Sequence, residues 1–412
     1  MTSKYIWSED NIPQIDVHST KKHDVLREYL KQYIFIVGGH PFQRSSLSIT
    51  FVDAFSGGGI YEKPGGGIYY GSPLIFLEST NEAASYLSGR KNFKLNAHYI
   101  FLDKQKTYLD FLKNVLIERG YKSQFDQTIF FRNGIFEQHV DDIINHIYKR
   151  KGTARRCIFL LDQYGYTDVP LHSIYKIFSR LPKSEIILTF YVDFLIDYLC
   201  NSESCKKSLQ QTGINFDLGR LDDIKSQKQW RTIIQRDLYV NLIAKSGAKY
   251  FTNFFIKSND SHKSYWLLHL SMHPKARNEM QKLHWELKNH FSHEGKAGLY
   301  MLGYDPKNDG FEHKQDFLFS DHDQVVNHNA LISDLPVHIP KMGVSFNNLF
   351  LEQCNFTPST KEMIGEAVSE LYTEREIRIL TKNGRSKKPW AKINDDDIIK
   401  RQNQIFLFQD HK

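Results

Sequence analysis

FVDAFSGGG, residues 51 to 59, joins the end of an apolar strand to an acid and a cluster of glycines. Glycine lacks a Cβ and tolerates positive φ, so such a turn lets the backbone approach a ligand closely. The spacing of Asp53, Phe55, Gly57 and Gly59 differs from the G-x-G-x-x-G of dinucleotide folds, and no Gly-Lys-Ser/Thr of a P-loop follows. It favours a ligand with a methionyl ammonium group and a ribose, which describes S-adenosylmethionine. A glycine-rich surface loop after a buried strand is the alternative.

Apolar runs recur along the chain on both sides of this turn. Stretches with apolar residues at helical spacing lie between them, at 107–118, 136–149 and 171–179, and another helix is expected from about 18 to 33. Alternating strands and helices predict an α/β fold with a Rossmann-like parallel sheet covered on both faces. The expected strands are SITFVDAF at 48–55, HYIFLD at 98–103, TIFFRN at 128–133, CIFLLD at 157–162 and EIILTFYVD at 185–193.

Polar residues end the first four of these runs, namely Asp53, Asp103, Asn133 and Asp162. In parallel sheets ligands bind outside the carboxyl ends of the strands, so these residues are candidate ligand contacts. Asp103 is predicted to accept hydrogen bonds from ribose hydroxyls, and the Asn133 amide to contact an adenine edge. For any single position, a helix cap or a turn residue is the competing interpretation.

The fourth strand runs into Asp162-Gln163-Tyr164-Gly165. Enzymes that methylate an amino group need an acceptor for the exocyclic NH2 and an aromatic face on which a flipped base stacks. Asp162 and Tyr164 are the predicted catalytic pair on that basis. Adenine and cytosine N-methylases usually carry proline after the acid, so Gln163 and Gly165 depart from their pattern. Packing of Tyr164 over the sheet edge is the alternative.

The rest of the chain predicts a division into parts. Residues 1–290 are the expected methyltransferase domain, with a helical insertion at about 194–247 and a closing antiparallel pair at 249–256 and 264–273. A helix is expected at 275–288. Residues 291–342, rich in His, Asp, Gly and Pro, predict a connecting region with a few strands, followed by a separate module at 343–412.

That final module combines a helical stripe with a hairpin signal. Ser359 and Glu362 have capping-box spacing before the helix, and Asn383-Gly384 predicts a hairpin turn between IRILTK and RSKKPWAKI. Helix followed by hairpin predicts a winged-helix-like module. Its hairpin tip is basic, with Trp390 nearby, and is a candidate for phosphate contact; a solvated basic loop is the alternative. The predicted nucleic-acid-binding residues are Arg385, Lys387 and Lys388.

Composition constrains these expectations. The 412 residues carry a formal charge of +7, which suits a polyanionic partner. Cys157, Cys200, Cys205 and Cys354 form no CxxC pair and have no suitably spaced His, so we expect neither a zinc site nor a disulfide framework, and no metal. With no signal-like start and no run long enough to cross a membrane, we expect a cytoplasmic protein without membrane contact.

Taken together, the segments resemble the three-Cys-motif partner proteins, bacterial proteins with a methyltransferase-like fold encoded beside a cysteine-motif partner. The resemblance rests on HSTKKHDVLREYL at 18–30, FVDAFSGGGIYEKPGGGIYYGSPL at 51–74, FLDK at 101–104, LLDQYGYTDVP at 160–170 and LSMHP at 270–274. The usual Asp-Pro-Tyr-Gly of the family is Asp162-Gln163-Tyr164-Gly165 here.

This resemblance implies an α/β fold with a Rossmann-like class I methyltransferase sheet, S-adenosylmethionine as the cofactor and the cysteine-motif protein as a partner. Asp53, Gly57 and Gly59, with Phe55 and Ser72 of the same segment, would line the methionine end, and Lys22 would reach the cofactor carboxylate. The leading hypothesis is a methyltransferase acting on nucleic acid within a bacterial multi-gene, phage-defence system. A catalytically silent, nucleotide-sensing partner subunit is the alternative. A nuclease is disfavoured, because no compact carboxylate cluster with a nearby lysine is found.

Overall fold

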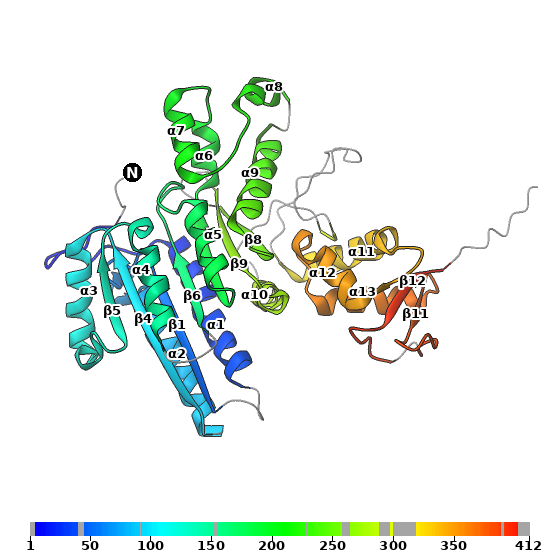
Figure 1. Ribbon diagram of the computed structural model, residues 1–412, viewed down its shortest axis with the longest axis horizontal. Helices are drawn as coiled ribbons and strands as arrows, with labels where there is room; N and C mark the ends of the chain where they lie inside the picture. Colours follow the sequence, from blue (N-terminus) through cyan, green and yellow to red (C-terminus); the bar gives the residue numbers. More distant parts are fainter. Residues whose placement is uncertain are drawn as a thin grey trace, which may run out of the picture. The chain divides into compact units, whose positions relative to one another are not determined.

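The computed structural model describes residues 5–39, 45–90, 92–150, 155–227, 230–257, 264–287, 297–299, 319–388 and 391–402. The chain forms two compact units, Met1–Phe291 and Ser292–Lys412 (Figure 1). No described helix combines the length and the apolar character that crossing a membrane requires.

The first unit is built on a seven-stranded sheet with the order β5-β4-β1-β6-β7-β9-β8. The first five strands in this order are parallel, and β9 is antiparallel to both β7 and β8. From β1 the chain moves outward to β4 and β5, and it later returns to the other side of β1 through β6 and β7. The switch point therefore lies between β1 and β6, where ligands bind in open α/β sheets. The strands are β1 (Ser46–Asp53), β4 (Lys94–Asp103), β5 (Ile129–Asn133), β6 (Arg156–Leu161), β7 (Ser184–Phe190), β8 (Tyr250–Lys257) and β9 (Ser264–Ser271).

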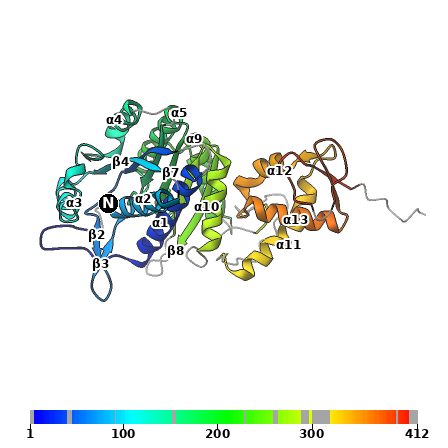
Figure 2. The ribbon, with the colours of Figure 1, turned by 90° about the horizontal axis from the view of Figure 1, so that it is seen from below.

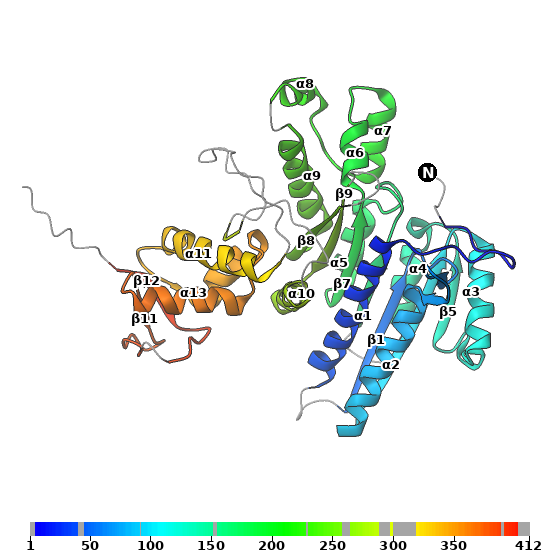
Figure 3. The same ribbon diagram turned by 180° about the vertical axis from the view of Figure 1, so that it is seen from behind.

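Helices cover both faces of this sheet, as the alternating pattern predicts (Figure 2). Buried apolar runs such as Phe51-Val52 form the central strands because both of their faces are covered. Helix α4 shows the matching amphipathic pattern, with Val140, Ile143 and Ile147 buried. One face carries α1 (Val17–Gly38), α2 (Ser72–Arg90) and α10 (Pro274–Glu286), and the other carries α4 (Phe136–Lys149), α5 (Leu171–Arg180) and α9 (Trp230–Ser246) (Figure 3).

Shorter elements complete the first unit. A small antiparallel hairpin follows the glycine turn, and its tip is Gly65 to Gly67, each with positive φ. Between β7 and β8 the described residues are mostly helical. The remaining elements are β2 (Ile60–Glu62), β3 (Ile68–Tyr70), α3 (Lys106–Glu118), α6 (Val192–Tyr198), α7 (Glu203–Thr212), α8 (Leu221–Lys225) and the 3-10 turns Lys122–Gln124 and Leu218–Arg220.

The second unit has the arrangement of a winged helix. Its three-stranded sheet has the order β10-β12-β11, and the apolar stripe of α13, including Ile364, Val368 and Leu371, is buried. The chain order is helix, strand, helix, helix, strand, strand, so the fold class expected from the sequence is confirmed. The elements are α11 (Asp321–His338), β10 (Val344–Ser345), α12 (Phe346–Gln353), a 3-10 turn (Cys354–Phe356), α13 (Lys361–Thr373), β11 (Ile377–Leu380) and β12 (Ile398–Arg401).

Three details of this unit differ from the sequence-based expectation. Residues 321–338, expected in a connecting region with a few strands, form α11, which begins with a capping box between Ser320 and Asp323. Thr360, not Ser359, caps α13, because the Ser359 hydroxyl is bonded to the Asn327 side chain.

The wing also closes differently from the predicted hairpin. The Asn383-Gly384 turn is present, with Gly384 at φ +76° and a hydrogen bond from the Thr381 amide to the Arg385 carbonyl. However, β11 pairs with β12, and the segment after the turn contributes a single bridge, Leu380 to Ser386. Trp390, expected near the tip of the wing, lies outside the described residues, as do residues 403–412.

Candidate active site

The carboxyl ends of β1, β4 and β6 open into one cavity of about 140 Å³. Six residues predicted from the sequence lie on its wall although they come from four separate segments. Parallel strands that end at the same edge of a sheet bring these segments together. The six residues are Lys22, Phe55, Gly57, Asp103, Asp162 and Tyr164.

Asp103, at the end of β4, is fixed by backbone groups. Its Oδ2 accepts a hydrogen bond from the Gly57 amide at 3.0 Å, and its Oδ1 accepts one from the Gln105 amide at 2.8 Å. Burial raises the pKa of Asp103, and these two amides oppose that shift. Each carboxylate oxygen keeps a second lone pair, so Asp103 can still accept a hydrogen bond from a ligand hydroxyl.

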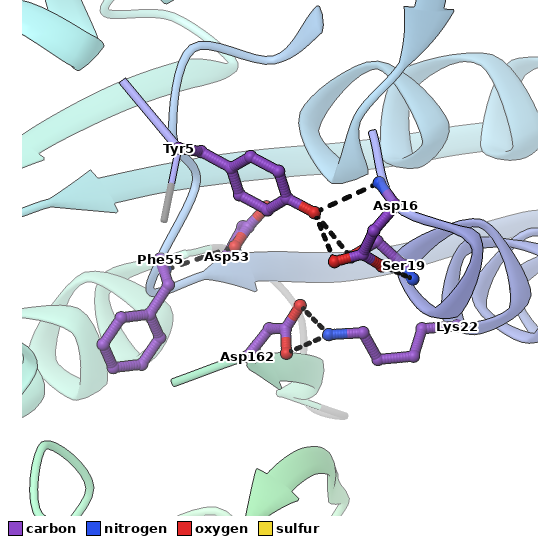
Figure 4. A network of polar contacts seen from close by, with 7 residues as sticks. All are labelled: Tyr5, Asp16, Ser19, Lys22, Asp53, Phe55 and Asp162. Carbon is purple, nitrogen blue, oxygen red and sulfur yellow. Dashed lines mark hydrogen bonds and ion pairs between the residues drawn. The ribbon is translucent and has the colours of Figure 1, made fainter. Parts of the chain in front are cut away.

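Asp162, just after β6, forms a bidentate ion pair with Lys22 of α1. The Lys22 Nζ lies 2.6 Å from Oδ1 and 2.7 Å from Oδ2 (Figure 4). Burial acts to raise the pKa of Asp162, but the Lys22 charge and hydrogen bonds outweigh it, so the pKa is lowered. Burial, and then the Lys22 charge, lowers the pKa of the adjacent His23 to about 3. The site therefore holds an ionised carboxylate next to a neutral imidazole. Lys22, predicted to reach the cofactor carboxylate, has its ammonium on Asp162 instead.

Asp53 lies behind the cavity wall, with none of its surface exposed. Its Oδ1 accepts a hydrogen bond from the Phe55 amide at 3.3 Å, and its Oδ2 is buried with no partner among the described residues. Burial raises the pKa of Asp53 to about 7, while the Ser72 side chain and the Phe55 amide oppose this, and the nearby charges of Asp162 and Asp103 add to it. Asp53 thus titrates near neutral pH directly beneath the glycine turn.

The loop after Asp162 is held by Gln163, the residue that departs from the amino-methylase pattern. Its side chain is 1% exposed, and Oε1 accepts hydrogen bonds from the amides of Asp168 and Val169, both at 3.1 Å. Tyr164, in contrast, is 40% exposed, and its ring centroid lies 5.5 Å from that of Tyr191. Gln163 therefore shapes the loop, while Tyr164 and Tyr191 present aromatic surface at the mouth of the cavity.

The N-terminal segment closes the cavity from the other side, a feature that the sequence analysis missed. The Trp7 indole donates a hydrogen bond to the Ile60 carbonyl at 2.7 Å, and the Tyr108 hydroxyl donates to the Tyr5 carbonyl at 3.1 Å. The Tyr5 hydroxyl donates to Asp16 at 2.8 Å, at the start of α1 (Figure 4). The Trp7 ring packs on the glycine turn so closely that a Cβ on Gly57 would lie 2.6 Å from it.

We expect Gly57→Ala to lower the free energy of unfolding by about 3 kcal/mol, since it combines a left-handed backbone with overpacking against Trp7. Gly57 has φ +55°. Urea unfolding followed by circular dichroism measures the change. Gly120→Ala is the matched control, because Gly120 has φ +82° but no described atom within 4 Å of its Cβ position. It should cost about 1 kcal/mol.

The Trp7→Ala background separates the two contributions to this cost. There the extra penalty of Gly57→Ala over Gly120→Ala should disappear, because the clashing ring is gone. If Gly57→Ala costs the same in both backgrounds, Trp7 does not pack on the turn as described.

Three further predicted residues do not lie on the cavity wall. Gly59 allows close packing instead, because a Cβ there would lie 2.5 Å from Leu112 of α3. Ser72 is the first residue of α2 and lies behind the wall, where its side chain opposes the rise in the pKa of Asp53. The Asn133 amide donates hydrogen bonds to the carbonyls of Asp103 and Lys104, so it ties two strand ends together and its donor group is in use. Gly134, Ile135 and Phe136 line the cavity in its place.

The predicted nucleic-acid-binding residues lie on the wing of the second unit. Arg385 and Lys388 are exposed. Lys387 is buried and forms an ion pair with Asp397, and its carbonyl accepts a hydrogen bond from the Tyr372 hydroxyl. Lys387 therefore braces the wing, which leaves Arg385 and Lys388 as the surface cations of this set. Among the described residues, no group of three or more His, Cys, Asp or Glu side chains is placed to hold a metal ion.

A known protein family matches part of the second unit. The sequence profile of the GMT-like wHTH domain matches residues 303–384. It covers the helices α11, α12 and α13 and the strands β10 and β11, so the chain carries a winged-helix domain at its C-terminal side. A search of curated proteins finds no match.

Solved structures similar to the chain include two methyltransferases, both at low similarity. A precorrin-6y C5,15-methyltransferase from Geobacter metallireducens is 11% identical, with a TM-score of 0.28, over 64% of this chain and 95% of that one. The N-terminal domain of human METTL16 in complex with SAH is 10% identical, with a TM-score of 0.28, over 60% of this chain and 70% of that one.

Proposed function

We propose that the protein is an S-adenosylmethionine-dependent methyltransferase that acts on nucleic acid. The observation that carries the proposal is that Asp103 and Asp162 line one cavity at the switch point of the sheet, with Asp53 buried behind its wall. The three carboxylates differ in environment: burial raises the pKa of Asp53 and of Asp103, whereas the Lys22 charge and hydrogen bonds lower the pKa of Asp162. Carboxylates with different pKa values can serve different roles, some in binding a ligand and one in catalysis.

The residues present fit this cofactor. Asp53 offers a buried carboxylate oxygen without a described partner, which complements a cationic group above the turn. Gly57 leaves no room for a Cβ, and Asp103 is held rigidly with acceptor capacity to spare for ribose hydroxyls. When bound, S-adenosylmethionine supplies an electrophilic methyl group.

Asp162 and Tyr164 would act on the methyl acceptor. The ionised carboxylate of Asp162 accepts a hydrogen bond from an exocyclic amine and so orients its lone pair. Lys22 keeps that carboxylate ionised and fixed in direction. The exposed Tyr164 ring offers a stacking face for a base taken out of its helix.

We further propose that the wing, not α13, contacts the nucleic acid. In many winged helices the third helix enters a groove, but here α13 exposes Glu362, Glu366 and Glu370 at successive four-residue steps. These charges would repel a phosphate backbone, whereas Arg385 and Lys388 on the wing would attract it.

The double variant Arg385→Ala/Lys388→Ala should bind a 20-base-pair DNA about tenfold more weakly and lower the slope of log K against log salt by about 2, one for each lost phosphate contact. Fluorescence anisotropy at several salt concentrations measures both. Lys207→Ala, on an exposed face of α7, is the control and should change neither. If Glu366→Gln raises the affinity tenfold while the double variant changes nothing, α13 and not the wing contacts the DNA.

A second candidate is a catalytically silent partner subunit. The observation in its favour is the small cavity, about 140 Å³, against roughly 300 Å³ or more for most ligand clefts. In the methyltransferase proposal, the segment that bears Tyr5 and Trp7 moves to admit the cofactor.

One experiment separates the two candidates. The full chain is titrated with S-adenosylmethionine in a calorimeter, and methyl transfer from a tritiated cofactor to DNA, RNA and protein pools is then counted. Binding with transfer to nucleic acid supports the proposal. Binding without transfer to any pool favours the silent subunit, and transfer to protein alone replaces nucleic acid as the substrate.

A further inference from the structure

Residues 5–7 lie over the glycine turn. The Trp7 ring covers two glycines of this turn, since a Cβ on Gly57 would lie 2.6 Å from the ring and a Cβ on Gly58 would lie 2.4 Å from it. Trp7 is 5% exposed, and it lines the cavity together with Tyr5. The indole therefore occupies the surface that the glycines open to close approach by lacking a Cβ.

Side chains hold this segment in place. The Trp7 indole donates a hydrogen bond to the Ile60 carbonyl. Its ring centroid lies 5.3 Å from that of Tyr61 and 5.0 Å from that of Tyr108, and both contacts are edge to face. Among the described residues, the backbone amides of Ile6 and Trp7 donate no hydrogen bond to another backbone group. Release of these side-chain contacts therefore frees the segment without unpairing a strand of the sheet.

Residues 13–15 are attached in a different way, by backbone pairing with β2. The Ile15 amide donates a hydrogen bond to the Glu62 carbonyl at 3.0 Å, and the Glu62 amide donates one to the Pro13 carbonyl at 3.0 Å. The next residue, Asp16, is the N-cap of α1 (Figure 4). These bonds do not involve residues 5–7, so this part stays fixed when the first part leaves.

A turn joins the two parts. The Ser8 amide donates a hydrogen bond to the Asn11 carbonyl at 3.0 Å, and the Asn11 amide donates one to the Ser8 carbonyl at 3.2 Å. Residues 8–11 are all exposed. Hinges in proteins are short loop segments that absorb a change of backbone angles. A turn of this kind between a part held by side chains and a part held by its backbone suits that role.

We propose that Trp7 is an internal plug, which covers the glycine turn until the cofactor displaces it, with residues 8–11 as the hinge and 13–15 as the anchor. This regulation rests on the proposed cofactor site. The indole and a ligand cannot lie on the same two glycines at once, because the ring already fills the space where their Cβ atoms would be. Displacing Tyr5 and Trp7 also enlarges the cavity from about 140 Å³ toward the roughly 300 Å³ of ligand clefts.

Affinity for the cofactor tests the plug. The full chain and its variants are titrated with S-adenosylmethionine in a calorimeter. Trp7→Ala should bind about tenfold more tightly, because a closed state that competes with the ligand lowers the apparent affinity. Tyr108→Phe keeps the ring and removes the hydrogen bond to the Tyr5 carbonyl, so it should bind about threefold more tightly. Ile6→Ala is the control and should bind as the parent does, since Ile6 is 61% exposed and does not line the cavity.

Tryptophan fluorescence gives a second measurement. Acrylamide quenching of the parent is compared with that of Trp7→Phe, and the difference reports on Trp7 alone. Trp7 should be shielded without the cofactor and accessible at saturation. Weaker binding by Trp7→Ala, or a Trp7 that stays shielded at saturation, overturns the plug and leaves the cofactor site in place. Binding by neither the parent nor Trp7→Ala removes the proposed function, and the plug with it.

Discussion

Asp162→Ala is expected to reduce methyl transfer by a factor of about 10² to 10⁴, the usual contribution of a positioned acid or base. Binding of S-adenosylmethionine should stay within a fewfold of the parent protein, because Asp162 lies on the acceptor side of the cavity and Asp103 on the ribose side. Transfer of tritium from the cofactor to nucleic acid gives the first value, and calorimetry gives the second.

The same substitution should also destabilise the fold, because it leaves the Lys22 ammonium without its bidentate partner. The Lys22 side chain is 10% exposed and that of Asp162 is 27% exposed. Breaking a buried pair from one side costs about 3 to 5 kcal/mol; partial exposure of Asp162 places this case at the lower end. Replacing both partners, as in Lys22→Met/Asp162→Ala, should recover most of that stability.

The double variant separates a structural from a functional role for Asp162. If Asp162 only holds α1 against β6, restoring stability restores whatever transfer was lost. If it acts on the methyl acceptor, the double variant unfolds at nearly the parent urea concentration but remains inactive. Glu118→Ala is the control, since Glu118 is an exposed acid that does not line the cavity. Full activity in Asp162→Ala would remove Asp162 from the mechanism.

The sequence predicts that three acids come together at one edge of the sheet, because that signal is local. Asp53, Asp103 and Asp162 each end an apolar run, and parallel pairing alone then brings the three strand ends to one edge. Register decides the rest: Asp53 lies opposite Phe101 on β4 and Leu160 on β6. Strand pairing does not show that Asp53 lies behind the cavity wall. Its position there depends on the conformation of the glycine turn that follows the strand.

Features built from distant segments were not predictable in this way. Tyr5 and Trp7 precede any periodic pattern, and their partners Ile60 and Tyr108 are far along the chain. The strand pairing of the wing was also not predictable from local sequence. The Asn383-Gly384 dipeptide fixes a turn, but which later strand pairs with β11 depends on the packing of the whole unit.

Asp53→Asn is expected to stabilise the folded protein while weakening cofactor binding. Burial raises the pKa of Asp53 from 3.8 to about 7, so above that pH the fold holds a charge that water would have solvated. Each pKa unit corresponds to about 1.4 kcal/mol, so this ionisation costs about 4 kcal/mol at pH 8. The neutral asparagine carries no such cost, and we expect a variant more stable by up to that amount.

The raised pKa of Asp53 makes the free energy of unfolding depend on pH. Between pH 4 and pH 7 the folded protein retains a proton on Asp53 that the unfolded chain has released, so stability falls as the pH rises through this window and is level above it. In Asp53→Asn, this fall in stability between pH 4 and pH 7 should be absent. Urea unfolding of both proteins at pH 4.5, 6 and 8 measures this fall, and Glu118→Gln, a change at an exposed acid outside the cavity, is the control and should keep it.

The affinity for the cofactor should change with pH in the opposite direction to the stability. The methionyl ammonium and sulfonium of S-adenosylmethionine favour the ionised form of Asp53, so affinity should rise as the pH increases toward 8 and should be at least tenfold lower in Asp53→Asn. Retained stability excludes misfolding as the cause of weaker binding. If Asp53→Asn is less stable than the parent at pH 8, the carboxylate is a structural acceptor and not a buried charge kept for the ligand. If it is more stable and binds the cofactor equally well, Asp53 has no part in the site.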